Sequence, residues 1–61
     1  MQGSLVTSKL IKKGEIIKLE HLTFKRPASG ISPKFIDQVL GKIAKEDISE
    51  DSILYWEMLE T

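Results

Sequence analysis

The sequence of 61 residues contains no cysteine and only one histidine. Without cysteine there is no disulfide framework and no thiolate metal site, and this fits a reducing compartment, so we expect a cytoplasmic location. A single histidine also excludes zinc sites built on several histidines. Long apolar runs are absent as well: the uncharged run Ser52–Trp56 is far shorter than the roughly 20 residues of a membrane span. We see no signal peptide and expect no membrane partner.

The net charge is zero, but the charged residues are unevenly distributed along the chain. Residues 1–34 carry seven basic and two acidic side chains, and residues 35–61 carry two basic and seven acidic ones. This polarity could steer an anionic partner to the basic half, or it could reflect two solvated faces that balance each other. A nucleic-acid partner is not expected, because the chain is not basic overall and no aromatic residues interleave the lysines.

A chain of this length forms one small domain with a thin core, which we place at residues 5–60. It buries about 60% of the surface that its unfolded form exposes, so its stability should be about 3–5 kcal/mol at most. Residues 1–4 are expected to be a linker or a remnant of the expression vector.

The sequence repeats itself once, at an offset of 37 residues that lays Ile11–Leu22 over Ile48–Leu59. Gly14 then matches Asp51, and both residue types tolerate the backbone of a tight corner. One copy cannot bury its own apolar side, whereas two copies that face each other can. The repeat therefore predicts internal pseudo-twofold symmetry, with the copies packed against each other. The matched apolar pairs are Ile11/Ile48, Ile16/Ile53, Ile17/Leu54, Leu19/Trp56, Leu22/Leu59 and Val6/Ile43, and Thr7 matches Ala44.

Each copy shows the same order of short elements. A strand leads to a polar corner, a second strand rich in β-branched isoleucine follows, and one 3₁₀-type turn with apolar residues at i and i+3 ends the copy. The predicted strands are Leu5–Ser8 and Glu15–Lys18 in the first copy and Lys42–Lys45 and Ser52–Tyr55 in the second, with helical turns at Leu19–Leu22 and Trp56–Leu59.

The segment between the copies contains one short helix, predicted at 33–40. Ser32 is a suitable N-cap, Pro33 suits the first helical position, and Gly41 suits the C-terminal stop. Before it, Pro27 favours an extended backbone at Arg26, and a turn follows in which Gly30 is free to adopt a positive φ.

The stretch from Lys25-Arg26-Pro27 through Gly30-Ile31-Ser32-Pro33 to Leu40-Gly41-Lys42, with the flanking copies, resembles the C-terminal antifreeze-like (SAF) domain of sialic acid synthases. The family also carries a segment like Ile11–Ile17, and the resemblance covers roughly residues 5–60. It implies a β-clip, pretzel-like fold, mostly β with short helical turns, that type III antifreeze proteins share. One departure is Ala28, where the family has glycine; alanine would be strained there if the backbone needed a positive φ.

The resemblance also implies a function for the full-length parent. An N-terminal (β/α)₈ barrel condenses phosphoenolpyruvate with an N-acetylmannosamine-type sugar, using a divalent metal, Mn or Mg. The antifreeze-like domain covers the barrel mouth of the partner subunit in a homodimer. The domain is not catalytic alone and holds no cofactor of its own. The arginine of the family's Lys-Arg-Pro segment contacts the sugar, and the matching residue here is Arg26.

Arginine suits that role because its guanidinium is a rigid fork of five donors that stays protonated. The alternative for Arg26 is a surface arginine paired with an acidic neighbour. Lys25 should point the opposite way and be solvated.

Other candidates indicate structure rather than chemistry. His21 is expected to be exposed to solvent, Trp56 to fill the core as Leu19 does in the first copy, and Phe24 and Phe35 to pack inside. Glu46-Asp47 and Glu50-Asp51 are expected at exposed corners. Nothing resembles a nucleophile elbow or a phosphate-binding glycine loop.

Two alternative functions fit the fold. An ice-binding protein needs a flat, rather apolar surface, which Lys9, Lys18, Glu20 and His21 should disrupt. The other alternative is a SAF domain of a pilus or flagellar assembly chaperone or of a sugar-acid dehydratase, which share the half-repeats but not the Lys25–Pro33 segment.

Overall fold

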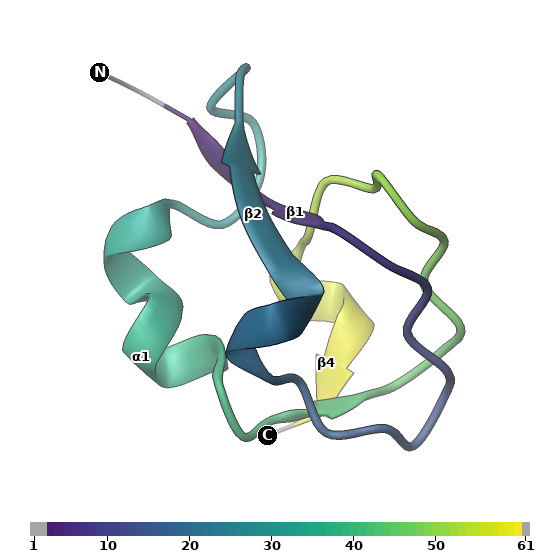
Figure 1. The fold of residues 1–61 in the computed structure, drawn as a ribbon. Coiled ribbons are helices and arrows are strands. Elements are labelled where there is room, and N and C mark those ends of the chain that lie inside the picture. The colour runs from purple at the N-terminus through teal and green to yellow at the C-terminus, as the bar shows by residue number, and fades with distance from the viewer. Residues whose placement is uncertain (1–2, 61) are drawn as a thin grey trace.

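The computed structural model describes residues 3–60 as short elements joined by tight turns. Residues 1 and 2, which are part of the expected N-terminal remnant, lie outside the described residues, whereas Ser4 begins the first strand. The elements, in chain order, are β1 (Ser4–Thr7), the 3₁₀ turn η1 (Leu19–His21), β2 (Leu22–Lys25), η2 (Pro33–Phe35), α1 (Ile36–Val39), β3 (Ile43–Ala44), η3 (Trp56–Met58) and β4 (Leu59–Glu60) (Figure 1).

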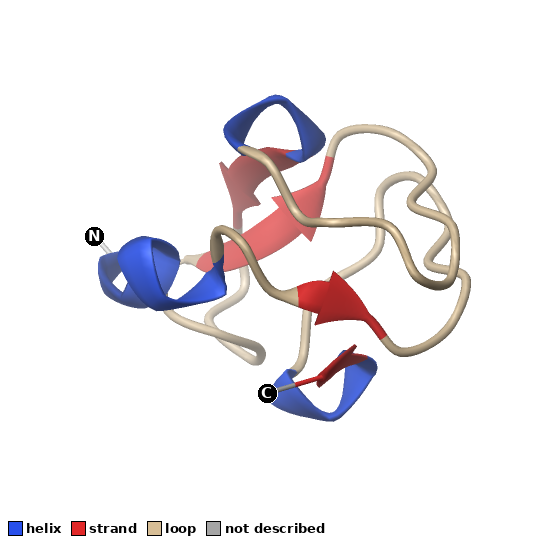
Figure 2. Ribbon diagram, turned by 90° about the horizontal axis from the view of Figure 1, so that it is seen from below, coloured by secondary structure: helices blue, strands red, loops and turns tan. Residues whose placement is uncertain are grey.

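The strands form two small antiparallel sheets, β1 with β2 and β3 with β4, each beside a 3₁₀ turn (Figure 2). In the first sheet Thr7 pairs with Leu22. In the second sheet Ala44 pairs with Leu59, which is the same pair moved by 37 residues. The predicted repeat is therefore a repeat of structure, and the mostly β fold with short helical turns is confirmed.

Backbone hydrogen bonds between the two copies also come in matched pairs. Leu54 N donates to Leu5 O at 2.9 Å, and Ile17 N donates to Lys42 O at 2.8 Å. Leu54 is the equivalent of Ile17 and Lys42 is the equivalent of Leu5 at the offset of 37 residues, so the two bonds join equivalent positions. The bridges of Val6 with Ile53 and of Ile16 with Ile43 are related in the same way. Each copy thus provides the backbone partners for the other copy in the same way, as pseudo-twofold symmetry requires.

The two polar corners share one backbone conformation. Gly14 has φ 88° and its counterpart Asp51 has φ 64°, and Asp51 is the non-glycine residue with positive φ in residues 3–60. Glycine adopts this conformation freely, and aspartate tolerates it better than most residues. The expected corners are confirmed. Ala28 does not have a positive φ, so the departure from the family pattern introduces no strain of that kind.

The core lies at the contact between the copies. Ile11 with Ile48 and Ile17 with Leu54 are buried equivalents, and Leu22, Phe35, Ile36 and Met58 pack around them while partly exposed. Its other buried members come from the first strand, the central segment and the second sheet: Leu5, Ile31, Val39, Ala44 and Leu59. At about 25 cal/mol per Å² of buried apolar area, so small a core leaves little margin.

The central helix matches its prediction closely. Helical backbone runs from Pro33 to Val39, first as η2 and then as α1. The Ser32 hydroxyl accepts a hydrogen bond from Lys34 N at 3.4 Å, and Gly41 has φ 93° beyond the helix end. Proline at the first turn and glycine after the last follow the usual asymmetry of helix ends.

The strand predictions need correction. The predicted strands Glu15–Lys18 and Ser52–Tyr55 are reduced to isolated bridges at Ile16 and Ile53, because the ladder with the other copy does not extend beyond the backbone bonds that flank each bridge. In their place, β2 and β4 begin at Leu22 and Leu59, directly after the helical turns. These strands were not predicted.

Four side-chain predictions were wrong. His21 is buried, with 3% of its surface exposed, because its ring Nδ1 accepts a hydrogen bond from Lys18 N inside the turn. Trp56 and Leu19 are 42% and 63% exposed, because the residues that face the core are the strand residues Leu22 and Leu59 after each turn. Phe24 is 58% exposed, whereas Phe35 packs against the core as expected.

Candidate functional site

Arg26 lies in an exposed loop that connects β2 to the central helix, at the top of Figure 1. The preceding residue, Lys25, ends β2, and the Arg26–Pro27 peptide bond is cis. The loop runs on through Ser29 to Gly30 and re-enters the core at Ile31, which is 2% exposed. The predicted site residue therefore sits on a surface loop whose two ends are built into the fold.

Hydrogen bonds from one buried residue organise this loop. The Ser4 hydroxyl donates to Pro27 O and accepts from Ser29 N at 3.0 Å and Gly30 N at 3.1 Å. Ser4 is fully buried and opens β1. A buried hydroxyl with one donor and two acceptor sites satisfied contributes strongly to a fixed loop geometry, because losing any partner would leave a buried polar group unpaired.

The far end of the loop is fixed by the other copy. Ile31 N donates to Leu54 O, and Leu5 N donates to Ile31 O, both at 2.9 Å. Gly30 does not have the expected positive φ. It is needed for close approach instead: a Cβ there would lie 2.5 Å from Ile53 Cγ2 and would overlap Leu54 O.

Lys25 lies beside the site and pairs with the other copy. Its Nζ is 2.7 Å from Asp51 Oδ1, and both side chains are more than half exposed. The interlocked copies thus bring a lysine of the basic half to a carboxylate of the acidic half. An exposed pair of this kind contributes little to stability, typically about 0–1 kcal/mol.

The buried histidine belongs to a second polar cluster, around the first corner. His21 Nε2 lies 3.5 Å from Glu15 Oε2, and Glu15 Oε1 accepts from Lys12 N at 2.8 Å. This backbone N–H is the main cause of the lowered pKa of the Glu15 carboxyl. Desolvation opposes it, and the charge and hydrogen bond of His21 and the charge of Lys18 lower the pKa further. Each group has a structural partner, so the cluster resembles a cap rather than an acid–base pair.

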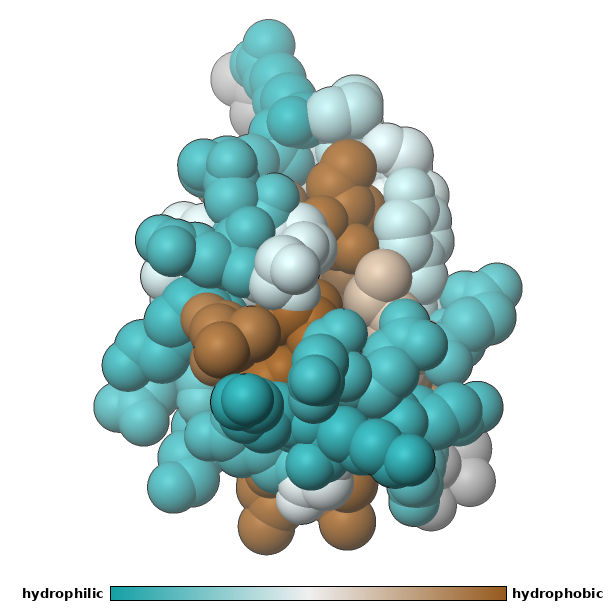
Figure 3. All heavy atoms as spheres, turned by 90° about the vertical axis from the view of Figure 1, so that its right-hand side faces the viewer, coloured by the Kyte–Doolittle hydropathy of each residue, from teal (hydrophilic) through white to brown (hydrophobic). Residues whose placement is uncertain are grey.

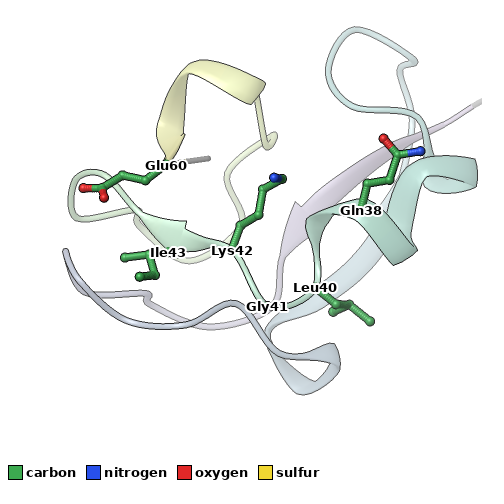
Figure 4. Close-up of a pocket in the computed structure, with 6 residues that line it drawn as sticks. All are labelled: Gln38, Leu40, Gly41, Lys42, Ile43 and Glu60. Carbon is green, nitrogen blue, oxygen red and sulfur yellow. The ribbon is translucent and has the colours of Figure 1, made fainter.

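An open hollow of about 340 Å³ lies between the end of α1 and the second sheet. Figure 4 shows the Lys42 side chain extending between the Gln38 amide on one side and the Glu60 carboxylate on the other. The hollow contains no hydroxyl or histidine side chain and lies apart from the residues of the Arg26 loop. It is lined by Gln38, Leu40, Gly41, Lys42, Ile43 and Glu60.

Large apolar side chains reach the surface at several places, and one face in Figure 3 shows apolar atoms among hydrophilic ones. Of the four residues predicted to disrupt an ice-binding surface, Lys9, Lys18 and Glu20 are exposed. His21 is buried and cannot have that effect. The exposed apolar residues are Leu10, Ile16, Leu19, Phe24, Ile43, Tyr55 and Trp56.

Acidic side chains do not gather into a metal site in residues 3–60. No three of the His, Asp and Glu side chains there are placed to hold an ion, and the Glu46-Asp47 and Glu50-Asp51 pairs are exposed as expected. In the same residues, no helix has the length and apolar character to cross a membrane.

The chain is similar to parts of several sugar-acid synthases. It is 51% identical over 54 residues to N,N'-diacetyllegionaminic acid synthase of Campylobacter jejuni, which covers 88% of this chain and 16% of that protein. It is 51% identical over 45 residues to a pseudaminic acid synthase of the same species, covering 74% and 13%. An uncharacterised protein of Methanocaldococcus jannaschii is 41% identical over 56 residues, covering 92% and 17%. The chain thus spans less than a fifth of the length of these relatives.

The fold has close counterparts among solved structures. The antifreeze protein-like domain of human N-acetylneuraminic acid phosphate synthase superposes with a TM-score of 0.93 at 28% identity, over 97% of this chain and 76% of that one. A putative spore coat polysaccharide biosynthesis protein E of Chromobacterium violaceum has the same fold, with a TM-score of 0.84 at 16% identity over 98% of this chain and 18% of that one. The SAF domain model matches residues 2–60. The chain belongs to the SAF domain family and is an antifreeze-like domain of the sialic and pseudaminic acid synthase type.

Proposed function

We propose that this domain covers the active site of a sugar-acid synthase and that Arg26 binds the acceptor sugar there. The parent enzyme would join phosphoenolpyruvate to an N-acetylmannosamine-type sugar in a (β/α)₈ barrel. The barrel would belong to the partner subunit of a homodimer and would hold the divalent metal, Mn or Mg, with its own residues. The domain alone would not be catalytic, and the parent would act in the cytoplasm.

The observation that carries this proposal is the placement of Arg26. It is exposed, yet the residues on both sides of it are held by β1. A guanidinium on a fixed backbone loses less entropy when it binds than one on a mobile loop. Five donors in a planar fork match the hydroxyl and carbonyl oxygens of an N-acetylated sugar. The site therefore suits recognition of oxygen acceptors on a polar ligand.

The covering role follows from barrel chemistry. Active sites of (β/α)₈ barrels open at the carboxyl ends of the strands, where they need a cover to exclude water. The residues of this chain would then orient the sugar, and the bond-forming groups would lie in the barrel. Fixing the acceptor against the enolpyruvate is a contribution of position and orientation.

The identity to legionaminic and pseudaminic acid synthases supports this setting over the alternatives. A SAF domain of an assembly chaperone or a dehydratase would not need the anchored Lys-Arg-Pro loop. An ice-binding surface would have to include the exposed charges of Lys9, Lys18 and Glu20.

The direct test is steady-state kinetics of the full-length parent with Arg26→Ala. Loss of charge-assisted hydrogen bonds should raise the KM for the sugar, or lower kcat, by about 10- to 100-fold. The KM for phosphoenolpyruvate should change little. Lys25→Ala is the matched control, because it removes the neighbouring charge and its exposed pair with Asp51. Unchanged sugar kinetics in Arg26→Ala would refute the site.

The contact across subunits has its own test. A subunit with Arg26→Ala is mixed with a subunit whose barrel is inactivated. If the domain serves the partner's barrel, each mixed dimer regains one intact site, and a random mixture recovers about a quarter of wild-type activity. If the domain serves its own barrel, the mixed dimers stay inactive.

A further inference from the structure

We propose that Ser4 is a positioning residue for Arg26: its hydroxyl sets the backbone on which the sugar-binding guanidinium stands. This inference rests on the proposed role of Arg26 and extends it to a residue outside the Lys25–Pro33 segment. The carrying observation is that one buried side chain reaches three backbone groups of the Arg26 loop.

Ser4 holds both chain neighbours of Arg26. On one side, Lys25 is the partner of Ser4 in the β1–β2 ladder. On the other side, Pro27 O accepts the Ser4 hydroxyl proton. Arg26 thus lies between two backbone positions fixed by the same residue. Removal of the hydroxyl releases the second of these positions and leaves the first in place.

The remaining two bonds hold the return of the loop. Ser29 N and Gly30 N both donate to Ser4 Oγ, at 3.0 and 3.1 Å. Gly30 is at the same time pressed against Leu54 O and Ile53 Cγ2. The loop is therefore clamped at Pro27 and again at Ser29-Gly30, and water cannot replace the fully buried hydroxyl without a rearrangement.

The internal symmetry shows that this clamp serves the loop rather than the fold. The position equivalent to Ser4 in the second copy is Gly41, which has no side chain. The matched bonds between the copies form in both halves, so the shared architecture does not require a hydroxyl at this position. The hydroxyl occurs in the copy that carries the Arg26 loop.

Thr7 offers a matched control on the same strand. It is buried like Ser4, its hydroxyl donates to Ser49 O at 2.6 Å, and it accepts from Ser52 N at 2.9 Å. These bonds fix the second corner and do not involve the Arg26 loop. Thr7→Val removes the hydroxyl with little change in shape, so it reports the general effect of losing a buried clamp on β1.

The experiment measures the KM for each substrate and kcat in the full-length parent. Ser4→Ala is expected to raise the sugar KM roughly 10-fold, with the phosphoenolpyruvate KM within about twofold of wild type. Ser4→Cys, whose thiol is somewhat larger than the hydroxyl and bonds only weakly, provides a second variant should Ser4→Ala not fold, and is expected to act in the same direction. Thr7→Val should leave the sugar KM near wild type.

A double variant separates this inference from the proposed function. In the Arg26→Ala background, Ser4→Ala should have no further effect on the sugar KM, because both changes remove the same interaction between Arg26 and the sugar. A wild-type sugar KM in both Ser4 variants, together with an impaired Arg26→Ala enzyme, overturns the positioning role and leaves the role of Arg26 intact. Equal losses in Ser4→Ala and Thr7→Val also overturn it. An unaffected Arg26→Ala enzyme overturns both.

Amide hydrogen exchange supplies a readout independent of catalysis. Exchange at Ser29 and Gly30 should be faster in Ser4→Ala by about 10-fold or more, with the Ser52 amide unchanged, and the reverse should hold for Thr7→Val. Protection at Ser29 and Gly30 that survives Ser4→Ala would show that the hydroxyl does not hold the loop.

Discussion

Ile11 and Ile48 bond to each other through both of their backbone polar groups. Ile11 N donates to Ile48 O at 2.9 Å, and Ile48 N donates to Ile11 O at 2.7 Å. They are also each other's equivalents in the repeat, so the symmetry axis passes through this bridge. Both side chains are buried. The centre of the interlock is thus a contact of one position with its own counterpart.

The bridge predicts a sharp difference between isoleucines of the same copy. Ile11→Ala and Ile48→Ala should each cost about 2–5 kcal/mol, because each leaves a cavity at the axis. That is comparable to the whole stability expected of so small a domain. Urea unfolding followed by circular dichroism measures the change. Ile16→Ala is the control: this residue is 49% exposed, and a loss as large as at Ile11 would contradict the assignment of the axis.

The repeat, its two corners and the central helix could be predicted from the sequence because they depend on patterns of residue types along the chain. Apolar residues at a constant offset marked the shared core, and the glycine–aspartate match marked the two corners, which share a positive φ. The capping serine and the proline marked the central helix. The position of Arg26 followed from a resemblance to a family and agrees with an exposed loop.

What the sequence could not predict depends on contacts between distant residues. The role of Ser4 requires knowing that β1 pairs with β2, which brings it to a loop more than 20 positions away. His21 is buried because its ring bonds to the backbone of Lys18, a local contact that a histidine on a polar turn does not reveal. Gly30 was assigned a turn conformation, whereas the neighbouring strand passes too close for any Cβ.

Because of that close approach, we expect Gly30 to tolerate substitution less well than Gly14. Gly30→Ala must displace Leu54 O or Ile53, and should cost about 2–4 kcal/mol as an overpacking change next to backbone. Gly14→Ala meets no atom and should cost only about 1–2 kcal/mol for its left-handed backbone. Chemical unfolding of both variants provides the comparison. Equal or reversed losses would show that the approach at Gly30 relaxes readily.

The first corner predicts a pH dependence of stability. The pKa of Glu15 is lowered in the folded chain, chiefly by the Lys12 N–H and also by His21. A carboxyl whose pKa is lower when folded stabilises the fold above its unfolded pKa of about 4.3, and this contribution disappears as the pH falls through the folded pKa. The free energy of unfolding should therefore fall more steeply below about pH 4.5 in the wild type than in Glu15→Gln. Parallel curves for the two proteins would contradict the assignment. Glu20→Gln, an exposed neighbour, is the control.

The aromatic pair between the second copy and the central helix predicts an unequal result at two equivalent positions. The rings of Trp56 and Phe35 meet edge to face, 6.1 Å apart at 65°. Trp56→Leu gives η3 the residue that its counterpart η1 has at Leu19, and should cost about 0.5–1.5 kcal/mol for the lost contact. Leu19→Ala should stay within about 0.5 kcal/mol, because the side chain is mostly exposed.

Phe35→Leu alone and together with Trp56→Leu completes a double-mutant cycle, measured by circular dichroism because Trp56 is the single tryptophan. A coupling of about 0.5 kcal/mol or more is expected between contacting residues. Strict additivity would show that Trp56 stabilises the domain through its own burial and not through Phe35.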